Sequence, residues 1–197
     1  MTGGERQTLV PSRFAGYVAW GHFSDVEKIV RSRQQYNIFI TGLSGNGKTL
    51  MVEQVCAKLK RECYRVNITR QTDEDDLLGG FRLINGNTVW VDGPVVSAMK
   101  NGGVLLLDEI DLGSHNLIVG TAVMNEAMLD RFPVTMEQPY PTRATERKIL
   151  AKAGCTDSDF ADHLTKWSEI IRKSFYEGAV DDIVSTRRLV DIVSAWN

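Results

Sequence analysis

The sequence lacks any long apolar run. The longest runs, such as residues 104–107, are far too short to cross a bilayer, which takes about 20 apolar residues in a helix. Residues 1–6 carry no apolar stretch of the kind that begins a secretory signal. Cysteine is scarce too: the 197 residues contain three, with no Cys-x-x-Cys pair, so we expect reduced thiols rather than a disulfide scaffold. These absences predict a cytoplasmic protein.

An excess of charge of one sign is also missing. Lys and Arg total 23 against 25 Asp and Glu, for a net charge of -2, so no basic field indicates nucleic acid as a partner. The three histidines are scattered and form no Cys/His cluster with zinc-ligand spacing. A hydrophobic content of 43% and a charged content of 24% are typical of a globular protein of one domain, or one domain with a small appendage.

Short apolar segments alternate with amphipathic ones up to about residue 140. Strands are expected at 36–41, 64–68, 104–107 and 132–136, and helices at 25–33 (with Ser24 as N-cap), 48–61, 94–100 and 114–129. A capping box beginning at Thr72 predicts a short further helix, and the turn residues 85–87 predict a hairpin with strands 81–84 and 88–91. Strands that alternate with helices predict an α/β fold with a parallel sheet flanked by helices.

The pattern changes after Tyr140-Pro141. The remaining chain has no convincing strand and contains three amphipathic runs, at 142–153, 158–176 and 186–196. We therefore expect a core at 1–140 and a small helical domain at 141–197, with Trp167, Ile170, Ile171 and Phe175 in its apolar interior.

Residues 42–49 match the phosphate-binding pattern G-x-x-x-x-G-K-[ST] at every fixed position, between a predicted strand and a predicted helix. Glycines let the backbone curl so that its N–H groups converge on phosphate oxygens, and the helix N-terminus adds positive potential. Lys48 is expected to reach the β- and γ-phosphates and Thr49 to ligate Mg²⁺. The residues expected to bind ATP are Gly42, Leu43, Ser44, Gly45, Asn46, Gly47, Lys48, Thr49 and Leu50.

The apolar strand at 104–107 ends in Asp108-Glu109, 60 residues after Lys48. Such a strand delivers acidic side chains to the sheet edge where open α/β folds bind ligands. Asp108 is expected to hold Mg²⁺, and Glu109 to orient and polarise the attacking water. Alone, this pattern also fits any buried strand with a solvated end, but the preceding phosphate-binding motif favours a Walker B strand.

Together the two motifs resemble those of AAA+ ATPases, with Asp-Glu at the second site. The segments 78–80 and 85–94, with Asp108 to Asp111 and Leu129 to Phe132, resemble MoxR-type ATPases. The similarity is closest to the ATPase subunit of cobaltochelatase and its phage-encoded relatives, and it covers roughly residues 16 to 195. A phage-encoded chain would act in the host cytoplasm.

The resemblance implies further roles. Arg131 would be an arginine finger reaching the γ-phosphate bound by a neighbouring subunit of a ring, which we expect to be a hexamer; the alternative is a surface arginine at a helix end. Arg187 would be the sensor 2 arginine of a helical lid over the nucleotide, with Arg188 as an adjacent candidate and a solvated pair as the alternative. The hairpin at 81–91 would face the central pore, where Trp90 either grips a substrate or packs on the hairpin.

One departure from the family pattern lies between the two acidic motifs. Only 22 residues separate Asp108 from Arg131, and the strand that ends in the sensor 1 asparagine is not recognisable. The join falls near 118–121, and neither Asn116 nor Asn125 follows a strand. Three explanations remain open: a segment missing from the printed sequence, a deletion in the chain, or a naturally shortened relative.

The function expected from these motifs is Mg²⁺-dependent ATP hydrolysis in a ring that remodels a protein partner. The alternative is a nucleotide-dependent binding or assembly protein with little turnover, which the missing sensor 1 region favours and Glu109 with Arg131 opposes. A third hypothesis, a DNA-translocating motor, is not favoured because the sequence has no basic stripe.

Overall fold

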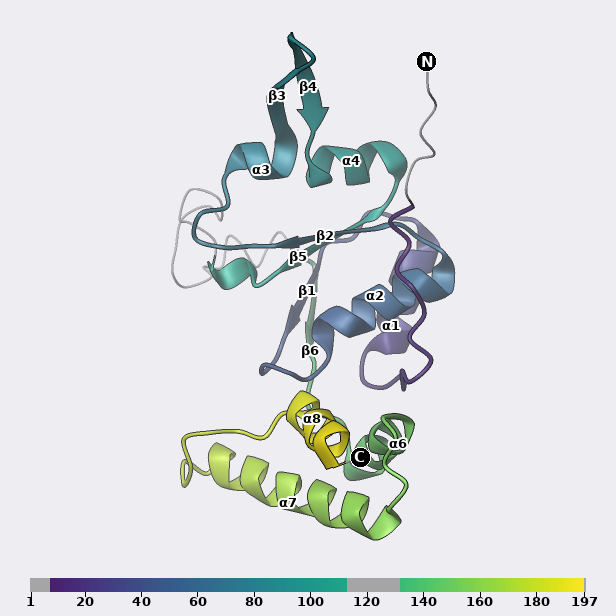
Figure 1. Cartoon of the computed structure of the whole chain (residues 1–197), viewed down its shortest axis with the longest axis vertical. Coiled ribbons are helices and arrows are strands. Elements are labelled where there is room, and N and C mark those ends of the chain that lie inside the picture. The colour runs from purple at the N-terminus through teal and green to yellow at the C-terminus, as the bar shows by residue number, and fades with distance from the viewer. Residues whose placement is uncertain (1–7, 113–131, 197) are drawn as a thin grey trace. The chain divides into compact units, whose positions relative to one another are not determined.

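The computed structural model describes residues 8–112 and 132–196 (Figure 1). The chain divides into two compact units. The first comprises Met1–Arg13, Ile29–Asn37 and Val52–Pro133, and the second comprises Phe14–Lys28, Ile38–Met51 and Val134–Asn197. Two helices, α1 (Phe23–Ser32) and α2 (Lys48–Leu59), contribute residues to both units.

The first unit contains a parallel strand pair. Strand β2 (Cys63–Asn67) pairs with β5 (Val104–Asp108) in a register that sets Asn67 opposite Asp108. Beneath them, Val55 and Cys56 of α2 are fully buried, and Ile68 is 1% exposed. This register brings the acidic end of β5 to the carboxyl end of both strands.

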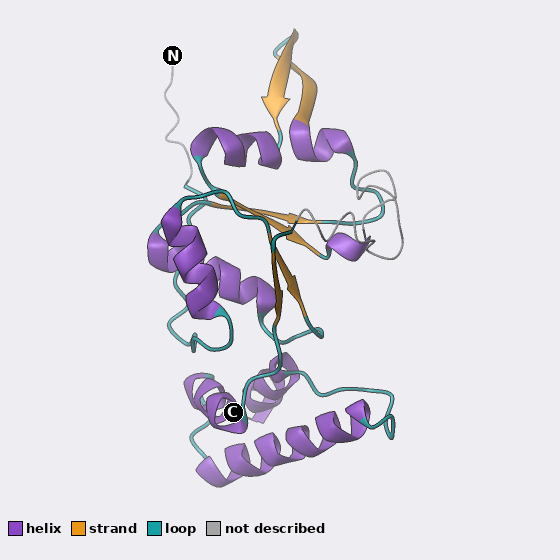
Figure 2. Ribbon diagram, turned by 180° about the vertical axis from the view of Figure 1, so that it is seen from behind, coloured by secondary structure: helices purple, strands orange, loops and turns teal. Residues whose placement is uncertain are grey.

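The same unit carries an antiparallel hairpin of β3 (Gly79–Ile84) and β4 (Asn87–Asp92). Asn85 and Gly86 both have positive φ, at 51° and 80°, as a tight two-residue hairpin turn requires. Helix α3 (Glu74–Leu78) precedes the hairpin and α4 (Pro94–Asn101) follows it (Figure 2). The apolar side chains of the hairpin are exposed, so its strands have little core to pack on.

The capping box of α3 is formed one residue later than the sequence predicts. The side chain of Asp73, not that of Thr72, accepts a hydrogen bond from the backbone N–H of Asp76, at 2.9 Å. In return, the Asp76 carboxylate accepts from the N–H of Asp73, at 3.2 Å. Thr72 instead accepts from the N–H of Thr69. An Asp at the N3 position replaces the usual Glu, so both boxes looked alike in the sequence.

The second unit joins a second parallel strand pair to three helices. Strand β1 (Ile38–Thr41) pairs with β6 (Val134–Glu137). After β6 come α6 (Arg143–Lys152), α7 (Ser158–Tyr176) and α8 (Thr186–Trp196). Their shared core is built from six buried side chains: Leu150, Ala161, Leu164, Val184, Leu189 and Val193. These three helices are called the lid helices below.

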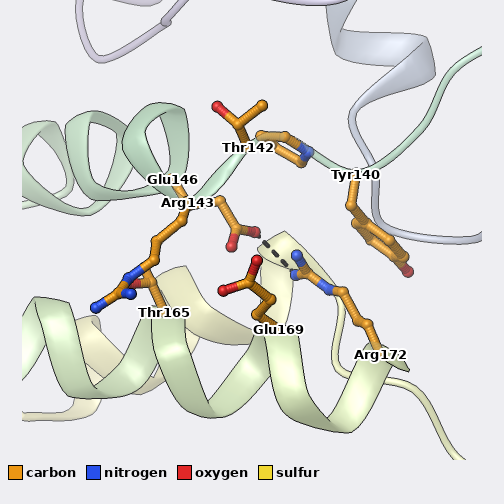
Figure 3. A pocket seen from close by; sticks show the side chains of 8 residues that line it. Tyr140, Thr142, Arg143, Glu146, Thr165, Glu169 and Arg172 are labelled. Atoms are coloured by element: carbon orange, nitrogen blue, oxygen red, sulfur yellow. Dashed lines mark hydrogen bonds and ion pairs between the residues drawn. The ribbon is translucent and has the colours of Figure 1, made fainter. Parts of the chain in front are cut away.

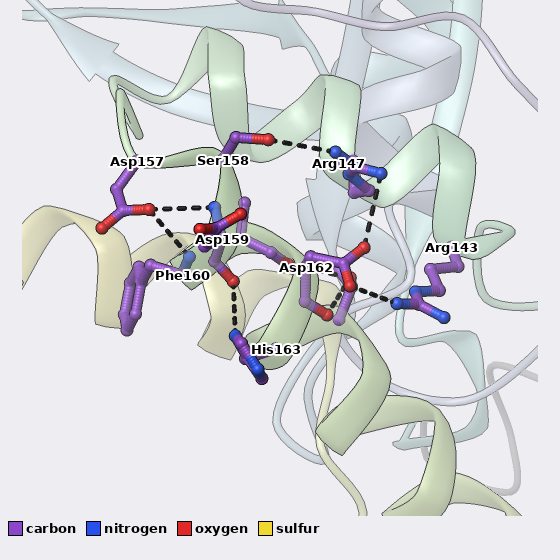
Figure 4. A network of polar contacts seen from close by, with 10 residues as sticks. Arg143, Arg147, Asp157, Ser158, Asp159, Phe160, Asp162 and His163 are labelled. Carbon is purple, nitrogen blue, oxygen red and sulfur yellow. Dashed lines mark hydrogen bonds and ion pairs between the residues drawn. The ribbon is translucent and has the colours of Figure 1, made fainter.

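Polar contacts on the outside of α6 and α7 fix the turn between these helices (Figure 4). The Asp157 carboxylate caps α7 by accepting from the N–H groups of Asp159 and Phe160, both at 2.9 Å. Asp162 pairs with Arg143 at 2.6 Å and with Arg147 at 3.3 Å. All these side chains are partly exposed, so the pairs contribute little to stability.

The predicted α/β fold is confirmed. The four core strands lie within two residues of their expected positions and pair two by two, both pairs parallel. Ser24 is not an N-cap, because α1 already begins at Phe23. Trp167 and Ile170 are 44% and 55% exposed, and only Ile171 of that stripe packs against the lid core.

The predicted helix at 114–129 lies outside the described residues. No helix of the described part of the chain is long and apolar enough to cross a membrane.

Candidate functional site

The loop between β1 and α2 has the backbone of an anion-binding turn. Gly42, Gly45 and Gly47 have φ values of 133°, 71° and 83°, which residues with a side chain rarely adopt. Within the described residues, the backbone N–H groups of Ser44, Gly45 and Gly47 donate to no protein acceptor. Such donors beside a helix N-terminus are suited to phosphate oxygens.

Lys48 lies over this loop at the first position of α2. Its ammonium donates to the carbonyl oxygens of Gly42 and Leu43, at 2.7 and 2.9 Å, and to Oδ1 of Asn46, at 3.2 Å. Thr49 and Leu50 follow in the first turn of the helix. The residues expected to bind ATP at 42–50 therefore form one continuous loop and helix start within the second unit.

Hydrogen bonds connect the phosphate-binding loop to Gln138, which directly follows β6. The buried Asn46 donates its side-chain amide to the carbonyl of Gln138. The N–H of Gln138 in turn donates to the carbonyl of Thr41, at 2.9 Å. His22 contributes its N–H to the side chain of Gln138 and a ring contact to the carbonyl of Glu137, at 3.3 and 3.1 Å. These contacts fix the loop to β6 without using its free N–H groups.

In the first unit, Asp108 stands at the end of β5 in an ion pair. Its Oδ2 lies 2.8 Å from Nη2 of Arg65, whose Nη1 lies 3.1 Å from Glu53. Although partial burial opposes it, the charges of Glu53 and Asp108 raise the pKa of Arg65 above its usual value. The Asp108 side chain keeps 20% exposure. A partly exposed carboxylate of this kind suits a hard cation such as Mg²⁺.

Glu109 is held in an unusual backbone conformation. Its φ is 53°, in the left-handed region that a residue with a side chain enters at a cost of about 1 kcal/mol. Three other described non-glycine residues share this sign of φ: Arg33 and Lys60 directly follow helices, and Asn85 lies in the hairpin turn. Glu109 directly follows a strand, and its side chain is exposed. Such strain clusters at functional sites.

Of the predicted arginines, the structure describes Arg187 and Arg188. Arg187 is the second residue of α8 in the second unit, where its backbone N–H lies 3.4 Å from the carbonyl of Gly45. Its side chain is exposed, whereas the adjacent Arg188 pairs with Asp182 at 3.1 Å. Arg131 lies outside the described residues. Sequence reasoning did not anticipate Tyr140, whose hydroxyl donates to the carbonyl of Ser44, at 2.8 Å.

Comparison with known proteins decides the family. Residues 37–157 match the AAA domain family, dynein-related subfamily. The chain belongs to this AAA family. The match begins just before β1 and extends into the lid helices, so it spans both the phosphate-binding loop and Asp108-Glu109. Membership carries the AAA+ P-loop fold and indicates a nucleotide-dependent activity.

This AAA chain is similar to several uncharacterized staphylococcal proteins. A protein of Staphylococcus epidermidis is 27% identical, covering 79% of this chain and 76% of its own length. One of Staphylococcus saprophyticus is 25% identical, covering 86% of this chain and 81% of its own length. Among solved structures, a mutant of Thermotoga maritima RuvB is similar with a TM-score of 0.47 and 14% identity, covering 95% of this chain and 73% of that one.

The staphylococcal relatives are longer within the aligned stretch. The alignment with the S. epidermidis protein spans 201 residues, more than the whole 197-residue chain, although it covers only 79% of that chain. The relative therefore carries residues inside the aligned stretch that this AAA chain lacks. Such a difference is expected if part of the family pattern is missing between Asp108 and Arg131.

Proposed function

We propose that this protein is a Mg²⁺-dependent ATPase of the MoxR type, which works as a hexameric ring on a protein partner. The observation that carries the proposal is the loop at 42–49. It combines three glycines of positive φ, free backbone donors and Lys48 at a helix start, in a chain of the AAA family.

The loop residues would hold the triphosphate. On binding, Lys48 would exchange its contacts with the loop carbonyls for β- and γ-phosphate oxygens, while the N–H groups of Gly45 and Gly47 donate to phosphate. Thr49 and Asp108 are the proposed ligands of Mg²⁺, since hydroxyl and carboxylate oxygens suit this cation. When bound, the metal neutralises charge that develops on the phosphates.

Hydrolysis would use one carboxylate and two arginines. Glu109 would accept a hydrogen bond from the attacking water and draw off its proton. Arg131 of a neighbouring subunit would stabilise the charge on the transferring phosphoryl group. Arg187, at the start of the lid helix that contacts Gly45, would interact with the same nucleotide as sensor 2.

The hairpin is the proposed contact with the protein partner, facing the pore of the ring. Phe81 and Leu83 are 70% and 77% exposed, and Trp90 is 47% exposed while it packs edge-on against Phe81 at 5.3 Å between ring centroids. Exposed apolar side chains on a hairpin are suited to transient grip on an unfolded segment.

A second candidate is an ATP-binding assembly protein with little turnover. The observation that favours it is the shorter aligned stretch relative to the staphylococcal proteins. We infer that the absent residues include the strand ending in sensor 1, which is not recognisable between Asp108 and Arg131. In this case the loop would bind ATP and fix the assembly state, and Glu109 would have no measurable role in turnover.

The steady-state ATPase rate as a function of protein concentration separates the two candidates, on a sample whose intact mass is checked. A rate per subunit that rises with concentration supports a ring in which a neighbour completes each site. Tight ATP binding with no turnover at any concentration supports the assembly protein. Stimulation by double-stranded DNA, with no response to unfolded protein, would contradict the protein partner.

A further inference from the structure

A chain of polar contacts runs from the phosphate-binding loop into the lid helices. It begins at the carbonyl of Ser44, which accepts a hydrogen bond from the hydroxyl of Tyr140 at 2.8 Å. The guanidinium of Arg172 lies over the ring of Tyr140, with its Cζ 4.1 Å from the ring centroid. Tyr140 therefore touches the loop with its hydroxyl and α7 with its ring.

Arg172 is itself fixed from two further directions. Its Nη2 lies 2.8 Å from Oε1 of Glu146 on α6, and its Nε donates to the carbonyl of Val184 at 2.8 Å. The side chains of Arg172 and Glu146 are only 10% and 2% exposed. Figure 3 shows this pair beside Tyr140 at the wall of a pocket of about 150 Å³.

Glu146 extends the chain to the third lid helix. Its Oε1 also accepts from the hydroxyl of Thr186 at 2.7 Å, and its Oε2 from that of Ser168 at 3.4 Å. Thr186 opens α8 and Ser168 lies in the middle of α7. One buried carboxylate thus receives donors from both other lid helices, which satisfies a charge that burial would otherwise penalise.

The start of α8 also contacts the phosphate-binding loop. The residue after Thr186, Arg187, directs its backbone N–H at the carbonyl of Gly45, at 3.4 Å. A Cβ atom on Gly45 would lie 2.6 Å from the Cβ of Ser185, so the loop and the first turn of α8 are in close contact. Two successive loop carbonyls, those of Ser44 and Gly45, are therefore connected through different residues to the same buried Glu146–Arg172 pair.

We propose that Tyr140, Arg172 and Glu146 form a positioning relay that couples the conformation of the loop at 42–49 to the packing of the lid helices. Buried ion pairs often add little net stability over apolar side chains, but they hold a defined geometry and resist rearrangement. The inference rests on the proposed function, because the ligand that would use this coupling is ATP bound at the loop. Coupling between sites of this kind typically changes affinity by about 5- to 150-fold.

Tyr140→Phe is the sharpest test, because it removes one hydroxyl and keeps the ring on which Arg172 lies. Tyr36→Phe is the matched control, since the Tyr36 hydroxyl donates locally, to the side chain of Gln34 at 2.9 Å. Arg172→Lys, with Arg147→Lys as control, tests the second link. Arg147 lies on α6, and its side chain, 45% exposed, contacts Asp162 and Ser158 of α7.

The first measurement is hydrogen exchange of the peptide covering residues 42–51 in nucleotide-free protein. The relay predicts faster exchange in Tyr140→Phe than in wild type and in Tyr36→Phe, at an unchanged melting temperature. Equal exchange in all three proteins would overturn the relay, whether or not the protein binds ATP. If Arg172→Lys does not fold, Tyr140→Phe still decides.

The second measurement is the Kd for ATP in the presence of Mg²⁺. It is combined with hydrogen exchange of α7 and α8, measured with and without ATP. We expect Tyr140→Phe to bind about 3- to 10-fold more weakly, the change from losing one hydrogen bond. ATP should slow exchange in the lid helices of wild type, and less so in this variant. Unchanged affinity and unchanged lid protection in Tyr140→Phe would overturn the coupling. A wild type that does not bind ATP would instead overturn the proposed function.

Discussion

Two arginine–carboxylate pairs in the two units share a geometry and differ in burial. The Glu146–Arg172 pair of the lid helices and the Asp108–Arg65 pair at the end of β5 both have nitrogen–oxygen distances of 2.8 Å. In the lid, the two side chains are 2% and 10% exposed, whereas Asp108 and Arg65 are 20% and 48% exposed.

Burial determines how readily each carboxylate can change its partner. Water and ions compete weakly for a buried carboxylate, so Glu146 keeps its three protein donors and fixes the helices around it. Near the surface, solvent screens an ion pair and its net free energy is small. The proposed role of Asp108 as a Mg²⁺ ligand requires a weak pair of this kind, because the metal would have to replace Arg65 on the carboxylate.

The largest effect is expected from breaking the buried pair. Glu146→Ala leaves the charge of Arg172 buried without its carboxylate, which should lower the free energy of unfolding by about 3–5 kcal/mol. Urea unfolding followed by circular dichroism measures this loss.

Glu177→Ala is the matched control, because Glu177 is 60% exposed and contacts Lys173 only at 3.8 Å. Its unfolding free energy should change by less than about 0.5 kcal/mol. Similar losses in the two variants would remove the distinction between buried and exposed pairs.

The next largest effect is expected at Glu109, which directly follows Asp108 in the sequence. Glu109→Gln should lower the ATPase rate by at least about 100-fold, since the amide cannot accept the proton of the attacking water. Binding of ATP and the free energy of unfolding should stay near those of wild type. Single-turnover kinetics with isothermal titration calorimetry measures both; retained turnover would refute the role given to Glu109.

A smaller effect is expected for the stability of the Asp108–Arg65 pair itself. A double-mutant cycle of Asp108→Asn and Arg65→Gln should give a coupling free energy below about 1 kcal/mol. A coupling as large as that expected in the lid would mean that Arg65 holds Asp108 too firmly for exchange with Mg²⁺.

The smallest effect concerns a third pair, at the base of the hairpin. Asp92 accepts from Lys100 at 2.6 Å and from the indole of Trp90 at 2.9 Å. The hydrogen bond from Lys100, followed by that from Trp90, lowers the pKa of Asp92. A lowered pKa means that these contacts stabilise the hairpin above the pKa of the unfolded chain and are lost as pH falls through the folded value.

The indole N–H resonance of Trp90 should report this titration. Its midpoint in acid should lie below the usual aspartate pKa of about 3.9, and Lys100→Gln should move it upward. A midpoint at or above the usual value in wild type would show that the hairpin base is not held by these contacts.

Much of the fold follows from local sequence. The glycines at 42, 45 and 47 with Lys48 specify the loop, because only glycine readily adopts the positive φ observed there. Strand and helix positions follow from apolar periodicity, which depends on neighbours within one turn or one strand. The capping box lies one residue later than predicted, at Asp73 instead of Thr72. Both residue types are favoured N-caps, and Asp is preferred over Thr.

The relay was not predictable in this way. Arg172 lies 26 positions after Glu146, and both resemble the charged residues of a solvated helix face. Tyr140 adjoins the predicted domain boundary, where no periodicity marks a contact with Ser44. Burial of a charged pair depends on how three helices pack, and pattern reasoning on single elements does not supply that. The role of Arg131 stays a prediction.

Isothermal titration calorimetry of ATP with Mg²⁺ tests the central claim, that the loop at 42–49 is the nucleotide site. Lys48→Ala removes the cation over the loop, and Lys28→Ala removes one that is 78% exposed on α1. We expect wild type and Lys28→Ala to bind ATP alike and Lys48→Ala to lose binding. ATP bound equally tightly by Lys48→Ala would contradict the claim.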